Sequence, residues 1–132
     1  MKYLIGNWKS NQNLTESILW LDSLQALRPK FDTNKLIILC LPFTDIAAFN
    51  KKLSETNLPI ITGAQNVSHF PPGKHTGEIT ASMLSELVVY CLVGHSERRI
   101  DFSETSEMVA QKAQLLLENA ITPIICLDTP YL

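Results

Sequence analysis

Residues 93–99 have the sequence Val93-Gly94-His95-Ser96-Glu97-Arg98-Arg99, and they follow the apolar run Leu87-Val88-Val89-Tyr90-Cys91-Leu92. A short apolar run that is rich in β-branched residues and leads to a glycine predicts a buried parallel strand followed by a tight turn. We expect His95 at the carboxyl end of this strand and near a helix amino terminus, where partial positive charge disfavours the imidazolium. A histidine in that place serves about equally well as a structural partner or as a catalytic group, so the rest of the chain must decide.

The remaining apolar runs alternate with segments of helical periodicity. We predict strands at residues 3–6, 35–41, 59–63 and 122–127, in addition to the run that ends at Val93. We predict helices over residues 14–24, 44–56, 80–87 and 103–120. For the first of these, Asn13 or Thr15 is a possible cap and Pro29 lies beyond the end. Continuous rather than alternating hydrophobicity in the strands indicates parallel βαβ units, and therefore an α/β fold.

The last predicted helix starts at Ser103-Glu104 and places Glu104 and Glu107 in its first turn, where acidic groups suit the helix dipole. Its inner side is expected to carry apolar residues at helical spacing, namely Val109, Ala113, Leu116 and Ala120.

Polar side chains with useful chemistry follow three of the predicted strands. Because the carboxyl ends of parallel strands meet at one edge, these side chains should converge on the face where α/β proteins of both barrel and open-sheet kinds place their sites. The residues are Asn7 and Lys9 after the first strand, Gln65 and Asn66 after the third, and His95 and Glu97 after the fourth.

Composition restricts the class of protein. The 132 residues predict one domain, residues 1–132, with 45% hydrophobic and 18% charged residues, as in globular proteins. A net charge of -2 gives no basic face for nucleic acid and no polybasic patch for a membrane surface. Three widely separated cysteines, Cys40, Cys91 and Cys126, indicate buried, reduced thiols rather than a disulfide framework or zinc site. With no signal peptide recognisable before Asn7, we expect a cytoplasmic protein.

The motifs at the strand ends resemble the triosephosphate isomerase family. Gly6-Asn7-Trp8-Lys9 is similar to the family's first-strand signature, and Gly94-His95-Ser96-Glu97-Arg98-Arg99 is similar to its fourth-strand motif. Gly63-Ala64-Gln65-Asn66 and Thr76-Gly77-Glu78-Ile79-Thr80 resemble its long third loop. A Gly-rich dinucleotide fingerprint is absent after the first strand, which disfavours a nucleotide-binding open sheet.

The resemblance implies a partial (β/α)₈ barrel. Such barrels need about 250 residues, so this chain would supply only the amino-terminal half, roughly (βα)₄ plus a fifth parallel strand. The implied activity is interconversion of dihydroxyacetone phosphate and D-glyceraldehyde 3-phosphate through an enediolate, in glycolysis and gluconeogenesis, with no cofactor and no metal.

The resemblance also assigns roles to individual residues. His95 would be a neutral imidazole that polarises the substrate oxygens. Lys9 would supply positive charge to the phosphate and the enediolate, Asn7 would orient Lys9 and contact substrate, and Glu97 would order Lys9 or the substrate oxygens. Ser96 would contact the general base, while Arg98 and Glu104 are expected to form a structural ion pair.

The family's general base is a glutamate on the sixth loop, after the fifth strand. We expect that loop to lie beyond this chain, together with the loops that grip the phosphate, so the chain alone should be inactive or nearly so. The segment Leu127-Asp128-Thr129-Pro130 departs from the family's usual sequence after Cys126.

The loop of residues 64–79 has no periodicity, and the resemblance implies that it docks into a neighbouring subunit. Thr76 and Gln65 would be dimer contacts in a homodimer of the complete protein, although Lys74 and His75 depart from the family's usual pair there. We expect His69 and His75 to be solvated.

A competing hypothesis is a non-catalytic half-barrel module that binds protein partners. A half barrel would leave its first and fifth strands as open edges and expose a large apolar surface on the inner face of the sheet.

Overall fold

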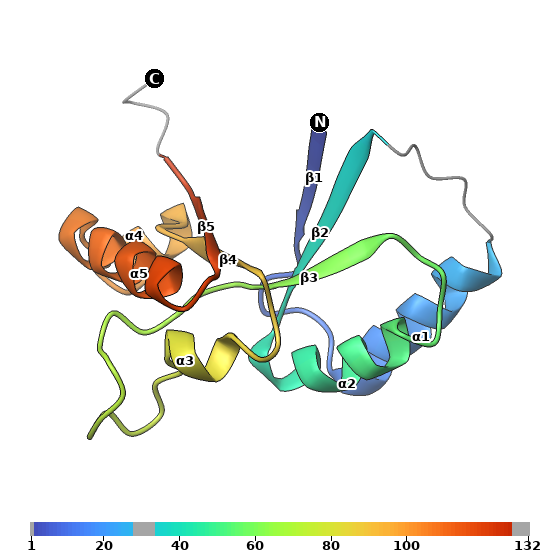
Figure 1. Ribbon diagram of the computed structural model, residues 1–132, viewed down its shortest axis with the longest axis horizontal. Coiled ribbons are helices and arrows are strands. Elements are labelled where there is room, and N and C mark those ends of the chain that lie inside the picture. Colours follow the sequence, from blue (N-terminus) through green and yellow to red (C-terminus); the bar gives the residue numbers. More distant parts are fainter. Residues whose placement is uncertain (1, 28–33, 128–132) are drawn as a thin grey trace.

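The computed structural model describes residues 2–27 and 34–127, and these form a single curled sheet of parallel strands with helices between them (Figure 1). The sheet order is the chain order: β1 (Lys2–Asn7), β2 (Lys35–Leu41), β3 (Ile60–Ala64), β4 (Tyr90–Val93) and β5 (Thr122–Ile125). The helices are α1 (Leu14–Ala26), α2 (Phe43–Leu53), α3 (Ala81–Leu84), α4 (Ser96–Asp101) and α5 (Ser106–Glu118). The predicted α/β fold, a partial barrel with (βα)₄ plus a fifth strand, is confirmed.

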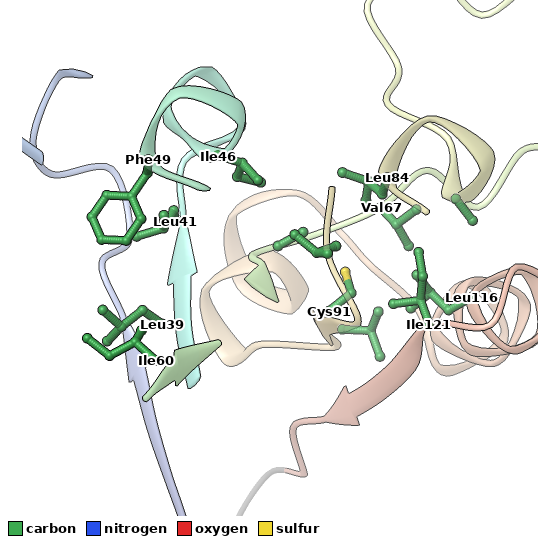
Figure 2. Close-up of a cluster of buried hydrophobic side chains, with 14 of the residues drawn as sticks. Leu39, Leu41, Ile46, Phe49, Ile60, Val67, Leu84, Cys91, Leu116 and Ile121 are labelled. Carbon is green, nitrogen blue, oxygen red and sulfur yellow. The ribbon is translucent and has the colours of Figure 1, made fainter. Parts of the chain in front are cut away.

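The main hydrophobic core lies between the sheet and its helices. Figure 2 shows part of it, with Phe49 and Ile46 of α2 over Leu41 of β2, and Val67 beside Leu84 of α3. Fully buried aliphatic and aromatic side chains of this kind each contribute about 1.5–3 kcal/mol to folding. The core therefore holds α2, α3 and α5 against the sheet and fixes the directions in which the strands end.

Helix α1 begins at a capping box. The Asn13 side chain accepts a hydrogen bond from the Glu16 amide at 3.1 Å, and the Glu16 carboxylate accepts one from the Asn13 amide at 2.8 Å. Of the two predicted caps, Asn13 and Thr15, the structure has Asn13. Further along α1, the buried Ser17 hydroxyl donates to Asp45 of α2 at 2.5 Å, which joins the two helices.

Part of the inner, concave face of the sheet is buried. Ile38 and Cys40 of β2 are fully buried, and Leu92 of β4 is 5% exposed, because the curl of the sheet brings these side chains into one small cluster. Apolar side chains of the edge strand β1 are more exposed, since Tyr3 and Leu4 are each 59% exposed. The sheet order confirms that β1 and β5 are the two edges, whereas the large exposed apolar surface on the inner face stays a prediction.

Several predicted boundaries also differ. Helix α2 ends at Leu53 rather than Thr56, α3 ends at Leu84 rather than Leu87, and β5 ends at Ile125 rather than Leu127. Strand β4 begins at Tyr90 rather than Leu87, because the amides of Leu87 and Val88 bond to the Leu84 carbonyl and complete the turn after α3. Helix α5 begins at Ser106 with Thr105 as its cap, so Glu107 lies in the first turn and Glu104 does not.

Helix α5 ends at Glu118, so Ala120 lies outside it and is exposed. Pro29 and the departure at residues 128–130 lie outside the described residues.

Candidate active site

The turn after β1 presents Lys9 in a constrained backbone conformation. Lys9 has φ +54°, which a non-glycine residue seldom adopts, and its amide donates to Asn7 Oδ1 at 3.0 Å. The preceding amide, of Trp8, donates to the Cys40 carbonyl at 3.1 Å, and the Trp8 ring packs edge-on against Phe49 with a centroid distance of 5.7 Å. Since left-handed backbone costs energy, it persists only where contacts such as these enforce it.

Lys9 reaches across to the end of β4. Its Nζ lies 2.5 Å from Glu97 Oε1, and each of the two side chains is 49% exposed. The hydrogen bond from Lys9 lowers the pKa of Glu97, and the positive charge of Lys9 adds to that effect. At this exposure the pair contributes little to stability, so its main consequence is to fix the position of the ammonium group.

His95 is the amino-terminal cap of α4, as its predicted place near a helix start requires. The Glu97 amide donates to His95 Nδ1 at 3.3 Å, so this nitrogen acts as an acceptor. Glu97 Oε2 also lies 3.5 Å from Nδ1, but a nitrogen that accepts an amide proton cannot donate to a carboxylate. This arrangement fits a neutral imidazole with its proton on Nε2, the nitrogen left free to donate.

A cavity of about 350 Å³ brings the predicted strand-end residues together. Its walls include Asn7 and Lys9 from the end of β1, Gln65 and Asn66 from the end of β3, and His95 and Glu97 from the end of β4. Gln65 Nε2 also donates to the Cys40 carbonyl at 3.0 Å, which ties the end of β3 to the end of β2. The cavity therefore combines the Lys9 ammonium group, the Arg98 guanidinium group, one carboxylate and one imidazole with several amides, a set suited to a small polar anion.

The order of these motifs along the chain can be compared with known proteins. The family model for triosephosphate isomerase matches residues 2–131. The chain belongs to the triosephosphate isomerase family. It is 42% identical to the triosephosphate isomerase of Picosynechococcus sp. over 127 residues, which cover 93% of this chain and 51% of that relative. It is 40% identical to the enzyme of that name from Thermus thermophilus over 126 residues, with 95% and 49% covered.

The triosephosphate isomerase of Corynebacterium glutamicum is 39% identical over 129 residues, which cover 96% of this chain and 50% of that relative. The chain thus spans about half the length of these relatives. The resemblance of the strand-end motifs to the triosephosphate isomerase family is confirmed, whereas the roles assigned to individual residues stay predictions.

The 64–79 loop of this family member begins against the core and then extends away from the rest of the chain (Figure 1). Val67 and Ser68 are buried, and Thr76 is exposed. The interpretation of His69 and His75 as solvated is wrong in part: both are half-buried, and their rings lie 3.9 Å and 4.1 Å from the Phe70 ring, with His75 stacked on it. The loop has internal packing of its own.

The predicted ion pair of Arg98 and Glu104 is present, with Arg98 Nε 2.9 Å from Glu104 Oε2. Burial alone would raise the pKa of Glu104, but hydrogen bonds from Lys112 and Arg98 outweigh it and leave that pKa below its usual range. Glu104 Oε1 accepts from the Gly94 amide at 3.1 Å, so the carboxylate holds the residue before His95.

Lys112 of α5 is the functional candidate that sequence reasoning missed. It is 2% exposed, its ammonium group bonds Glu104 Oε2, and it also donates to Asn66 Oδ1 at 2.8 Å. The sequence did hold a signal: Lys112 lies three residues after Val109 and four before Leu116, on the stripe that faces the core. A lysine on an inward stripe requires a buried partner.

The thiols of Cys40 and Cys91 are free and buried as predicted, while Cys126 is half-buried. Burial raises the pKa of Cys40 to about 12, so this thiol stays protonated at neutral pH. Within residues 2–27 and 34–127, the histidine, cysteine and acidic side chains form no group of three or more suited to a metal ion. No helix of that part of the chain is long and apolar enough to cross a membrane.

Proposed function

We propose that the cavity is the electrophilic half of a triosephosphate isomerase site, which interconverts dihydroxyacetone phosphate and D-glyceraldehyde 3-phosphate. The single observation that supports this best is the Glu97 amide bonded to His95 Nδ1 at 3.3 Å, beside the Lys9 ammonium group. Removing a proton next to a carbonyl places negative charge on the carbonyl oxygen. A neutral His95 donates to that oxygen through Nε2, while Lys9 neutralises charge on the phosphate and on the enediolate.

Asn7 and Glu97 position Lys9 in this scheme. Asn7 fixes the turn through the Lys9 amide, and Glu97 holds the ammonium group across the cavity at 2.5 Å. Ser96, between His95 and Glu97 at the start of α4, is the proposed contact for the base.

The general base is proposed to come from outside the residues described. Among the described residues that line the cavity, Glu97 is the single carboxylate, and it already forms an ion pair with Lys9. General-base catalysis contributes about 10²–10⁴-fold. The 132-residue chain alone is therefore expected to isomerise its substrate slowly or not at all.

Complementation tests this function. The chain is mixed with the carboxyl-terminal half of the Picosynechococcus relative, and isomerisation of glyceraldehyde 3-phosphate is followed in a coupled assay. Activity should appear in the mixture, and His95→Gln should lower kcat about 10²–10³-fold, the usual cost of removing one oxyanion donor. His69→Gln, in the 64–79 loop, is the matched control. An active mixture that tolerates His95→Gln as well as His69→Gln would show that His95 is not the electrophile.

Substrate charge recognition can be measured on the complemented protein. Lys9→Met should weaken binding of a three-carbon phosphate monoester at least tenfold, or about 1.4 kcal/mol, in an NMR titration. Lys51→Met, at an exposed position on α2, should leave that affinity unchanged. Equal losses in the two variants would mean that the phosphate does not bind beside Lys9.

A homodimer in the cytoplasm is the proposed state of the complete protein. The exposure of Thr76 on the extended 64–79 loop supports a subunit contact there. Gln65 is half-buried and bonds its own chain through the Cys40 carbonyl, so its proposed contact would use the remainder of its amide group. Sedimentation of the complemented protein, with and without Thr76→Asp, tests the dimer.

The exposed β1 edge supports a second candidate function, a non-catalytic half-barrel module that binds proteins. Tyr3 and Leu4 present apolar side chains at an edge strand, an arrangement that favours pairing with another chain. The same titration separates the two functions. A phosphate monoester that shifts neither Lys9 nor His95 resonances, even in the complemented protein, would favour the binding module.

A further inference from the structure

A buried chain of polar contacts connects the start of the 64–79 loop to the residue before His95. Lys112 Nζ donates to Asn66 Oδ1 at 2.8 Å and also bonds Glu104 Oε2. Glu104 Oε1 in turn accepts from the Gly94 amide at 3.1 Å. One lysine side chain thus lies between two segments that are far apart in sequence and that both line the cavity.

Both segments are also held by neighbouring contacts. Val67, directly after Asn66, is fully buried in the core beside Leu84 (Figure 2). At the other end, Arg99 Nε donates to the Gly94 carbonyl at 2.9 Å. Because packing leaves little room for independent movement, a shift of Asn66 is passed to Lys112 rather than absorbed by a loose side chain.

The charges make this connection stiff. Lys112 and Glu104 are 2% and 4% exposed, so neither can exchange its partner for water. Charge-assisted hydrogen bonds of this kind are about twice as strong as neutral ones. The side-chain polar atoms buried in the described residues all have a partner, so this network has no unsatisfied member at which it could yield.

We propose that Lys112 is a positioning residue that couples the 64–79 loop to His95. The ammonium group sets the place of Asn66 on one side and, through Glu104 and Gly94, the place of His95 on the other. A partner that engages the loop therefore changes the position of His95 without touching it. This inference rests on the proposed function for the importance of His95, but the coupling itself requires no substrate.

A double-mutant cycle read by NMR on the full chain tests the coupling. The readouts are the Gly94 and His95 amide shifts and the ¹⁵N shifts of the His95 ring, which report its tautomer. Asn66→Ala removes only the loop end of the network and leaves the Lys112–Glu104 pair intact. It should shift the Gly94 and His95 signals, and the same substitution in a Lys112→Met background should produce less than half of that shift.

Gln65→Ala is the matched control, because Gln65 lines the same cavity but bonds the Cys40 carbonyl instead of Lys112. Any shift that it causes at His95 should be the same in both backgrounds. If Lys112→Met does not fold, the double substitution Lys112→Met/Glu104→Gln removes both buried charges of the pair and serves as the background.

Two results would overturn the proposal: Asn66→Ala shifts the Gly94 and His95 signals equally in both backgrounds, or does not shift them at all. Since no substrate is present, failure of His95 as the electrophile would leave the NMR result unchanged. Failure of the coupling would equally leave the effect of His95→Gln in the complementation assay intact.

Discussion

Replacement of Gly94 by alanine should destabilise the chain more than any other glycine-to-alanine change at a left-handed position in the described residues. Gly94 has φ +71°, and left-handed backbone costs an L-residue about 1–2 kcal/mol. A Cβ there would also lie 2.9 Å from Arg99 Nη2 and 3.1 Å from both methyl groups of Val109. Overpacking of this kind costs about 1–3 kcal/mol, so the two effects together amount to about 2–5 kcal/mol.

Gly77→Ala separates the two contributions. Gly77 has φ +92°, but its added Cβ would meet no atom within 4 Å. Gly77→Ala should therefore cost no more than the backbone strain of about 1–2 kcal/mol. In both variants, alanine also lowers the conformational entropy of the unfolded chain, which offsets the destabilisation by about 0.4–1 kcal/mol.

Urea denaturation of the two variants measures the difference. The midpoint should fall further for Gly94→Ala, with a difference in unfolding free energy of about 1–3 kcal/mol between the variants. A typical domain has only about 5–15 kcal/mol of stability, so this difference is readily resolved. Equal losses in the two variants would refute the close packing of Gly94 against Arg99 and Val109.

Three further changes have outcomes that the local structure predicts. Ala120 has φ +57° just after the end of α5, where the Ile121 amide bonds the Leu116 carbonyl in a Schellman motif. Because glycine adopts this left-handed backbone without strain, Ala120→Gly should raise the unfolding free energy by about 0.5–1 kcal/mol in urea denaturation. Asn13→Ala removes one arm of the capping box and should lower the unfolding free energy by about 1 kcal/mol in the same assay. Because the pKa of Glu104 is lowered in the folded chain, its contribution is complete above its ordinary value of 4.5 and is lost as the pH falls through the lower folded-state value. Glu104→Gln should therefore lower the unfolding free energy by about 3–5 kcal/mol at neutral pH. The variant should also lose less stability on acidification than the parent chain, as measured by urea midpoints at neutral pH and at a pH below the folded-state pKa of Glu104.

The sequence predicted the five parallel strands because their apolar runs are continuous and are separated by turn residues. The predicted boundaries of the elements were less accurate where tertiary contacts override the local helix or strand preference of the sequence. Glu104 follows Ser103, which has φ +54°, and its carboxylate is used by Gly94, Arg98 and Lys112 rather than by the helix dipole. Helical periodicity alone does not reveal such a use.

The strand-end positions of the site residues also followed from sequence, because parallel strands direct their carboxyl ends to one edge. The Lys9–Glu97 contact depends on how far the sheet curls, and the sequence pattern carries no measure of that curl. The stacking of His75 on Phe70 depends on the path of a loop without periodicity, so it too required the structure. Lys112 was missed because a charged residue is normally assigned to the exposed side of a helix, whereas Lys112 lies on the side of α5 that faces the core.

The structure also explains why Glu97 is a poor choice for the general base, although it lines the cavity. A base works best when its pKa lies near the operating pH, which for a carboxylate requires burial or a neighbouring negative charge. Glu97 has the opposite surroundings, because the hydrogen bond from Lys9 lowers its pKa. Releasing Lys9 would raise that pKa but would also free the ammonium group that the proposed anionic substrate needs in place. The two demands conflict within one ion pair. In the proposed function, stabilisation of charge and abstraction of the proton are therefore best served by separate carboxylates, and Glu97 is the one proposed to position Lys9.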